Sequence, residues 1–249
     1  MSARIEELCR TLRLSGLAAS VQELEPGPCS EEILGFLRCA LETEYELRLA
    51  RKRLNAIRVA GFPTMKRFDD VVVDLLPDDG RSYLSVLKQL QFIEDHQNIL
   101  MIGNSGTGKT HLAIATGVLA CEQGYRVMFK TTAGLVNELV EAKQERRLTY
   151  LLRQLKRVDL LILDELGYIT FDLAGAELLF QLLASRYEAA STMITSNLVF
   201  SEWVKIFHDK ALTAALLDRI THRALVLNMT GTSFRQRGSP KDSSARRQK

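Results

Sequence analysis

Apolar residues in the N-terminal part of the chain recur at helical spacing. One face of a first helix is formed by Ile5, Leu8, Cys9 and Leu12, because residues three and four apart lie on the same side of a helix. After a Glu-Pro-Gly-Pro break at residues 25–28, Ser30 is expected to cap a second helix, whose apolar face comprises Ile33, Leu37, Ala40, Leu41, Tyr45, Leu54 and Ile57. Gly61-Phe62-Pro63 ends it, since proline cannot continue a helix. The pattern predicts a small all-helical domain at residues 1–66.

From about Asp95 onward, short apolar runs alternate with stretches of helical pattern. The runs predict five strands: Asn98–Ile102, Arg126–Lys130, Leu160–Leu163, Met193–Ser196 and Leu225–Met229. Such alternation favours a parallel sheet covered by helices on both faces. We therefore expect an α/β domain at residues 67–234, followed by a basic tail at residues 235–249.

The composition fits a water-soluble protein. The chain has 249 residues, of which 46% are hydrophobic and 25% charged, so it contains enough apolar surface for a core. No apolar run approaches the roughly 20 residues of a membrane helix, and the charged N-terminus has no signal-peptide core. Four cysteines and four histidines lack the close spacing of zinc ligands. These features predict a cytoplasmic protein without a membrane partner.

The overall charge of +3 conceals local basic clusters. Residues 231–249 hold six basic side chains against one acid, so the basic excess lies in the tail. Two further clusters are candidate DNA-binding surfaces, because cations there neutralise phosphates without reading sequence. The first comprises Arg48, Arg51, Lys52, Arg53 and Arg58, and the second Lys143, Arg146, Arg147, Arg153, Lys156 and Arg157. A solvated helix face is the alternative for either cluster.

The motif GNSGTGKT at residues 103–110 matches the phosphate-loop pattern G-x-x-x-x-G-K-[ST]. A predicted strand precedes it and a predicted helix follows, so backbone N–H groups and the helix N-terminus face an anion. Lys109 is expected to reach the terminal phosphates and Thr110 to ligate Mg²⁺. The expected nucleotide-binding residues are Gly103, Asn104, Ser105, Gly106, Thr107, Gly108, Lys109, Thr110 and His111.

The run LLILDE at residues 160–165 is an apolar strand that ends in two acids. Acids at the carboxyl edge of a parallel sheet face the crevice where ligands bind. Asp164 is therefore a candidate Mg²⁺ ligand, and Glu165 a candidate base for an attacking water. A strand that ends in a solvated acidic turn is the alternative.

Asn197 and Arg219 are two further candidate catalytic residues. If the strand before Asn197 lies between the two motif strands, Asn197 stands near the terminal phosphate; otherwise it is a turn residue. Arg219 follows an Ala/Leu-rich helix, and its guanidinium suits charge stabilisation at a neighbouring subunit's nucleotide. A surface pair with Asp218 is the alternative.

Together, GNSGTGKT, LLILDE, ITSN and LDRI resemble the motifs of AAA+ ATPases of the initiator and helicase-loader clade. More narrowly, TLRLSGLAASVQEL, RLARKRLNAIRVAGFP and RYEAASTMITSN look like segments of IstB-type transposition helper ATPases of insertion sequences. This resemblance covers nearly the whole chain.

The resemblance implies an ATP- and Mg²⁺-dependent ATPase that oligomerises on duplex DNA, deforms it and assists a cognate transposase in selecting target DNA. Asn197 then matches the first sensor, Arg219 the arginine finger and Arg235 the second sensor. Only about twenty residues follow the last predicted strand. That is too few for the helical lid that normally carries the second sensor, so we expect the lid to be absent.

Two other functions use the same phosphate loop. A replicative helicase loader of the DnaC type has a similar ATPase domain and an N-terminal segment for helicase docking; the TLRLSGLA pattern favours the transposition helper. A small-molecule kinase transfers phosphate to a metabolite, and both the Asp-Glu pair and the basic segment at residues 143–157 argue against it.

Overall fold

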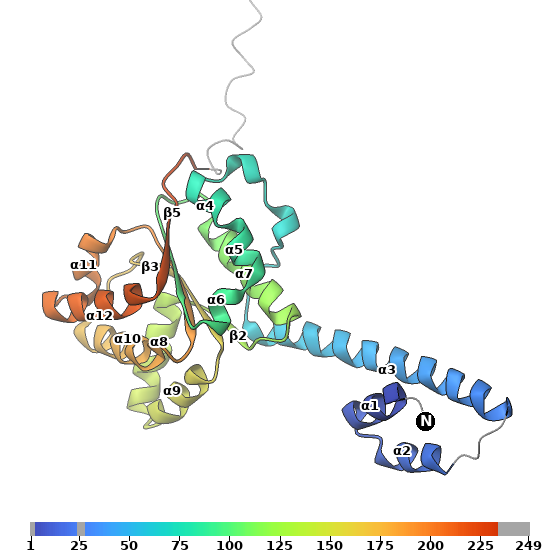
Figure 1. Ribbon diagram of the computed structural model, residues 1–249. Helices are drawn as coiled ribbons and strands as arrows, with labels where there is room; N and C mark the ends of the chain where they lie inside the picture. Colours follow the sequence, from blue (N-terminus) through green and yellow to red (C-terminus); the bar gives the residue numbers. More distant parts are fainter. Residues whose placement is uncertain (1–2, 24–27, 234–249) are drawn as a thin grey trace, which may run out of the picture. The chain divides into compact units, whose positions relative to one another are not determined.

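The computed structural model describes residues 3–23 and 28–233 (Figure 1). The chain divides into two compact units, Met1–Asn55 and Ala56–Lys249. Arg235 and the basic tail lie outside the described residues. Within the described residues, none of the helices is both long enough and apolar enough to span a membrane.

The first unit contains α1 (Ala3–Leu12), α2 (Ser15–Gln22) and most of α3 (Pro28–Ala60). Its core confirms the predicted face of the first helix, because all four residues of that face are buried. Val21 of α2 and Leu41 of α3 complete this core. Arg48 joins two of the helices, since its Nη1 donates to the carbonyl oxygen of Leu12 (3.1 Å).

The predicted apolar face of α3 is wrong at several positions. Leu41 is buried and Leu37 and Tyr45 are partly buried, but Ile33 is 50% exposed and Leu54 67% exposed. The core formed with α1 and α2 contacts only a short length of α3. Helical spacing by itself does not reveal how much of a long helix its neighbours cover.

The boundary between the units also differs from the sequence expectation. The division falls inside α3, after Asn55, whereas the sequence suggested residue 66. Ile57 and Ala60 are buried in the core of the second unit, and Phe62 packs against that core. The last turn of α3 therefore belongs to the α/β unit.

The second unit is built on five parallel strands in the order β2-β3-β4-β1-β5. The strands are β1 (Asn98–Ile102), β2 (Val127–Thr131), β3 (Leu160–Leu166), β4 (Ser191–Ser196) and β5 (Ala224–Asn228). All five predicted strands are confirmed, with small differences at their ends. The predicted α/β fold with a parallel sheet is likewise confirmed.

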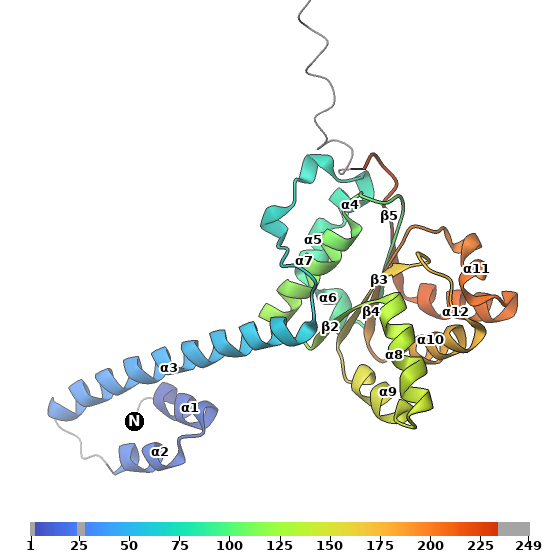
Figure 2. The same cartoon turned by 180° about the vertical axis from the view of Figure 1, so that it is seen from behind.

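Helices cover both faces of this sheet (Figures 1 and 2). One face carries α5 (Leu84–Gln89), α6 (Gln91–Glu94) and α7 (Lys109–Glu122), and the other carries α8 (Thr132–Gln144), α9 (Leu148–Lys156), α10 (Leu173–Arg186), α11 (Val204–Phe207) and α12 (Lys210–His222). Short turns η1 (Phe68–Asp70), η2 (Val73–Leu75) and η3 (Phe200–Glu202) and helix α4 (Asp78–Ser82) complete the unit.

The strands bury side chains on both faces, as alternation along a strand requires. Ile99 and Met101 of β1 pack toward the α7 side, whereas Leu100 and Ile102 pack toward the α8–α10 side. Cys121 of α7 is buried on the same side of the sheet as Ile99 and Met101, and this burial raises the pKa of its thiol to about 11. The sheet is thus a central layer, buried on both faces, whose carboxyl edge carries the loops after β1, β3 and β4.

Candidate functional site

The loop after β1 wraps around the side chain of Lys109. Gly108, the N-cap residue directly before α7, has φ +95°, in the left-handed region that favours glycine. Lys109 is the first residue of the helix, and its Nζ donates to the carbonyl oxygens of Gly103 (2.7 Å) and Asn104 (2.6 Å). This geometry directs the ammonium group and the N-terminus of a 14-residue helix toward the same space.

The two predicted motifs meet at the carboxylate of Asp164. Asp164 is 4% exposed and lies two residues before the end of β3. Its Oδ1 accepts hydrogen bonds from the hydroxyl of Thr110 (3.0 Å) and from that of Thr195 on β4 (2.5 Å). The phosphate loop and the acidic strand therefore form one site.

Glu165 and Asn197 line the same cavity and are both exposed. Glu165 has φ +61°, an uncommon conformation for a residue with a side chain, and its backbone N–H donates to Thr195 Oγ1 (2.9 Å). β4 lies between β1 and β3, the strand order that the prediction for Asn197 requires.

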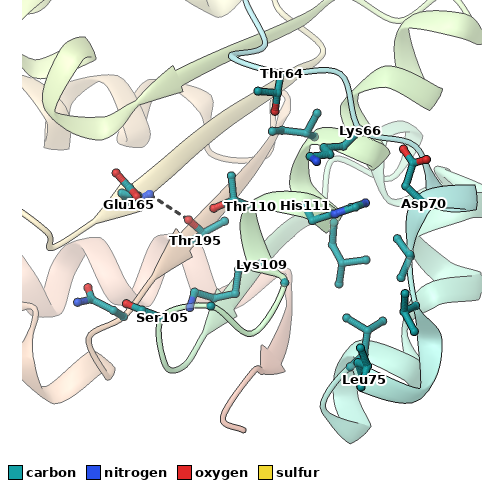
Figure 3. Close-up of a pocket in the computed structure, with 18 of the residues that line it drawn as sticks. Thr64, Lys66, Asp70, Leu75, Ser105, Lys109, Thr110, His111, Glu165 and Thr195 are labelled. Carbon is teal, nitrogen blue, oxygen red and sulfur yellow. Dashed lines mark hydrogen bonds between the residues drawn. The ribbon is translucent and has the colours of Figure 1, made fainter. Parts of the chain in front are cut away.

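The cavity has a volume of about 650 Å³ and two chemically different ends (Figure 3). In this view Glu165 and Thr195 lie on one side of Lys109 and Thr110, and His111, Asp70 and Leu75 lie on the other. The second end is lined by a segment before the sheet, with Val71, Val72, Leu75 and Leu76, and by Ile114 of α7. One end is therefore polar, whereas the other combines these apolar side chains with Lys66, Asp70 and His111. We call this second end the apolar end.

Sequence reasoning missed most of the apolar end. Lys66, Asp70 and the four apolar lining residues between positions 71 and 76 precede the sheet and carry no recognisable motif. His111 was predicted, and its Nε2 lies 3.3 Å from the carbonyl oxygen of Arg67 in that same segment. Thr195 was missed as well, although it stands within the ITSN sequence that drew attention to Asn197.

The chain that follows β5 lies directly against the phosphate loop. Asn104 Nδ2 donates to the carbonyl oxygen of Gly231 (3.4 Å), and a Cβ added at Gly103 would lie 2.3 Å from the carbonyl oxygen of Met229. Gly103 thus has no room for a side chain. The segment continues toward Arg235, whose predicted role as second sensor falls outside the described residues.

Arg219 does not line the cavity. It lies on α12, and its guanidinium carbon is 5.2 Å from the ring centroid of Phe180 on α10. The structure therefore places Arg219 outside the lining of the cavity in its own chain.

The predicted basic clusters lie on α3 and on the α8–α9 segment. All their cationic side chains are exposed. Arg48 pairs with Glu44 (2.6 Å) in addition to its bond to Leu12, and Arg147 pairs with Glu145. The side-chain hydrogen bond from Arg147 to Glu145 raises the pKa of the guanidinium. Both residues are therefore partly engaged within the protein.

The oxygen ligands at Thr110 and Asp164 fit a magnesium ion that is held mainly by its nucleotide. Mg²⁺ prefers oxygen donors and commonly takes only one or two of them from protein, with phosphates and water supplying the rest. Among the described residues, no group of three or more His, Cys, Asp and Glu side chains is placed to hold a metal ion by itself. The two side chains thus suit a metal that arrives with a polyphosphate.

Residues 7–242 match the family model described as IstB-like ATP binding protein. The chain belongs to this family. It is 37% identical to an IS21 putative ATP-binding protein of Pseudomonas aeruginosa, over 93% of this chain and 88% of the relative. Identity is also 37% with the IS5376 putative ATP-binding protein of Geobacillus stearothermophilus, over 95% of each chain. The resemblance stated from the sequence is confirmed, and ATP is the nucleotide named for the family.

Solved structures show the same fold. DnaI has a TM-score of 0.57 and 22% identity, covering 71% of this chain and 94% of its own. The DnaC helicase loader has a TM-score of 0.51 and 23% identity, covering 68% and 96%. DnaA bound to AMPPCP and single-stranded DNA has a TM-score of 0.51 and 22% identity over 61% of this chain, which spans 47% of the DnaA chain. The α/β unit therefore shares the fold of these DnaI, DnaC and DnaA structures.

Proposed function

We propose that this protein is an ATP-dependent, DNA-binding ATPase that oligomerises on duplex DNA, deforms it and assists a transposase in selecting and joining target DNA. The observation that carries the proposal is that Thr110 and Glu165 line one cavity with the phosphate loop, and that Thr110 bonds the Asp164 carboxylate just behind it.

The two ends of the cavity suit the two ends of ATP. The phosphate loop and Lys109 supply N–H groups and positive charge for the triphosphate. Val72, Leu75 and Ile114 supply an apolar surface for the adenine ring at the other end. A volume of about 650 Å³ lies within the usual range for ligand sites.

Hydrolysis requires a water molecule to attack the terminal phosphorus. The water oxygen bonds to phosphorus while Glu165 accepts a proton from the water. The bond between the terminal phosphorus and the oxygen of the leaving ADP breaks. The Asn197 side chain orients the water or the terminal phosphate. Thr110 and Asp164 would hold Mg²⁺, which neutralises developing charge on the phosphate oxygens when bound.

Substitution at Lys109 and Glu165 tests this mechanism. Lys109→Ala removes the cation of the phosphate loop and should weaken ATP binding about 100-fold in a fluorescence titration. Glu165→Gln should bind ATP normally and hydrolyse it at least about 100 times more slowly. Lys205→Ala, at an exposed lysine paired with Glu202, is the control. Equal ATP affinity in Lys109→Ala and wild type would refute the proposed site.

The DNA-binding surface is assigned to α8 and α9. Leu151 and Leu155 of α9 are buried and Leu148 and Leu152 pack partly against the same core, so the opposite face of this helix is exposed. Arg146, Arg153, Lys156 and Arg157 are exposed there, and the neighbouring Glu145 is already paired with Arg147. Cations on a surface helix bind phosphate oxygens of a duplex. Arg51, Lys52 and Arg53 of α3 form a second exposed basic surface in the other unit.

The transposase partner is inferred from the relatives. The first curated relatives are all ATP-binding proteins of insertion sequences, and such elements move by means of a transposase. A helper that binds target DNA suits the basic surfaces, and the proposed site of action is the bacterial cytoplasm.

Electron microscopy of the protein with duplex DNA and ATP tests assembly. We expect regular oligomers on bent duplex with ATP, persistent oligomers for Glu165→Gln, and far fewer for Lys109→Ala when no ATP-binding subunit is mixed with it. The transposase of the same element should retain these complexes in a pull-down assay. A preference for single strands together with capture of a replicative helicase would instead support a helicase loader and overturn the proposal.

A further inference from the structure

Thr195 lies at an interruption in the pairing of β3 with β4. Leu163 pairs with Ile194 and Leu166 pairs with Ser196, so two residues of β3, Asp164 and Glu165, stand opposite Thr195 alone. This arrangement is a β-bulge, which bends a strand and re-aims a side chain. Glu165 adopts the left-handed conformation at this bulge, and a non-glycine residue does so only when its surroundings hold it there.

The Thr195 hydroxyl bonds both residues of the bulge. It donates to Asp164 Oδ1 (2.5 Å) and accepts from the backbone N–H of Glu165 (2.9 Å). Thr195 is 1% exposed, so water does not readily replace either bond. The Thr195 hydroxyl therefore satisfies the backbone N–H of Glu165 at the bulge. It also bonds the Asp164 carboxylate, to which Thr110 donates as well.

We propose that Thr195 is a positioning residue, whose hydroxyl holds the bulge that directs Glu165 into the cavity. The inference rests on the proposed hydrolysis of ATP. It predicts that Thr195 affects turnover through Glu165 and leaves ATP binding, which depends on the phosphate loop, nearly unchanged.

Thr195→Val tests the role, because valine keeps the volume and removes both hydrogen bonds. Turnover should fall roughly 10- to 100-fold, as for other residues that orient a reacting group, with ATP affinity close to wild type. Thr195→Ser keeps the hydroxyl and should restore most of the turnover. Thr116→Val is the matched control, since Thr116 is buried in α7 and its hydroxyl bonds only Leu112 of the same helix. Thr195→Ala replaces Thr195→Val if the latter does not fold.

A double-mutant cycle separates positioning from a general loss of structure. In the Glu165→Gln background, Thr195→Val should lower turnover much less than it does in wild type, because the Glu165 carboxylate that Thr195 positions is already gone and only the bond to Asp164 remains to be lost. A multiplicative loss would overturn the inference, as would wild-type turnover in Thr195→Val. Amide exchange at Glu165 gives a readout independent of activity: it should accelerate in Thr195→Val and not in Thr195→Ser. Absence of ATP turnover in wild type would instead refute the proposed function.

Discussion

Arg186 is a buried charge whose role is structural. Its guanidinium is 2% exposed and donates to the carbonyl oxygens of Leu155 (2.6 Å), Val158 (3.0 Å) and Ser191 (2.6 Å) and to Thr192 Oγ1 (3.1 Å). Burial lowers the pKa of this group to about 10, although the nearby Asp159 opposes the shift. Arg186 therefore joins the end of α9 to the start of β4.

Arg186→Ala should reduce the free energy of unfolding by about 3 kcal/mol or more, because it leaves several buried carbonyl groups without donors and opens a cavity. Chemical denaturation monitored by circular dichroism measures this loss. Arg186→Lys should recover only part of it, since an ammonium group cannot reproduce the planar fork. The exposed Arg223 provides a control, and Arg223→Ala should be neutral. An equally stable Arg186→Ala protein would contradict the structural role.

Sequence reasoning found the site residues that belong to short motifs. It missed those whose contacts are with residues far away in the sequence. Short motifs predicted Lys109, Thr110 and Asp164, because each of them stands in a loop or strand formed by a few consecutive residues. Thr195 and Arg186 act through contacts between separate strands and helices. Threonine in a strand and arginine in a helix are ordinary at the sequence level, so neither stands out before the chain is folded.

Among the elements, the five strands were predictable because β-strands buried on both faces read as short apolar runs. The sequence did not predict which part of α3 its neighbours bury. Ile33 and Leu54 fit a helical stripe, yet they are exposed, since burial depends on which neighbours reach that length of the helix. The apolar end of the cavity was missed for a related reason: the segment at residues 64–76 gains its role only by lying beside α7.

If α8 and α9 bind DNA, the affinity for duplex should depend on salt concentration through the cations of this segment. Replacing Arg146, Arg153 and Arg157 together with glutamine should weaken duplex binding and reduce the slope of log K against log salt by up to about 3, one unit for each lost phosphate contact. Fluorescence anisotropy with labelled duplex over a range of salt concentrations measures the slope.

Two controls accompany the salt experiment. Arg10→Gln removes an exposed arginine outside both clusters and should leave the slope unchanged. Tyr150→Ala removes an aromatic ring that is 64% exposed on the same helix but carries no charge, so any loss of affinity should leave the slope as it was. An unaltered slope in the triple variant would remove α8 and α9 from the DNA-binding surface.

At the scale of the whole molecule, the position of Arg219 allows a test of whether the protein works as a monomer or as an assembly of subunits. Arg219 is absent from the lining of its own cavity and rests on Phe180. If it acts on the nucleotide of a neighbouring subunit, Arg219→Ala and Lys109→Ala each lose turnover for different reasons. The first lacks the cation that completes its neighbour's site, and the second lacks its own ATP.

Mixing the two inactive variants should therefore restore activity. At equal amounts, about a quarter of head-to-tail interfaces would join an intact cavity to an intact Arg219, so turnover should recover to about a quarter of wild type. A coupled phosphate-release assay with duplex DNA measures it. The control is a mixture of Lys109→Ala with Glu165→Gln, which should stay inactive because both changes fall in the same cavity and no interface then contains a complete site. If Arg219→Ala alone turns over ATP as wild type does, or if the first mixture remains inactive, Arg219 does not act between subunits.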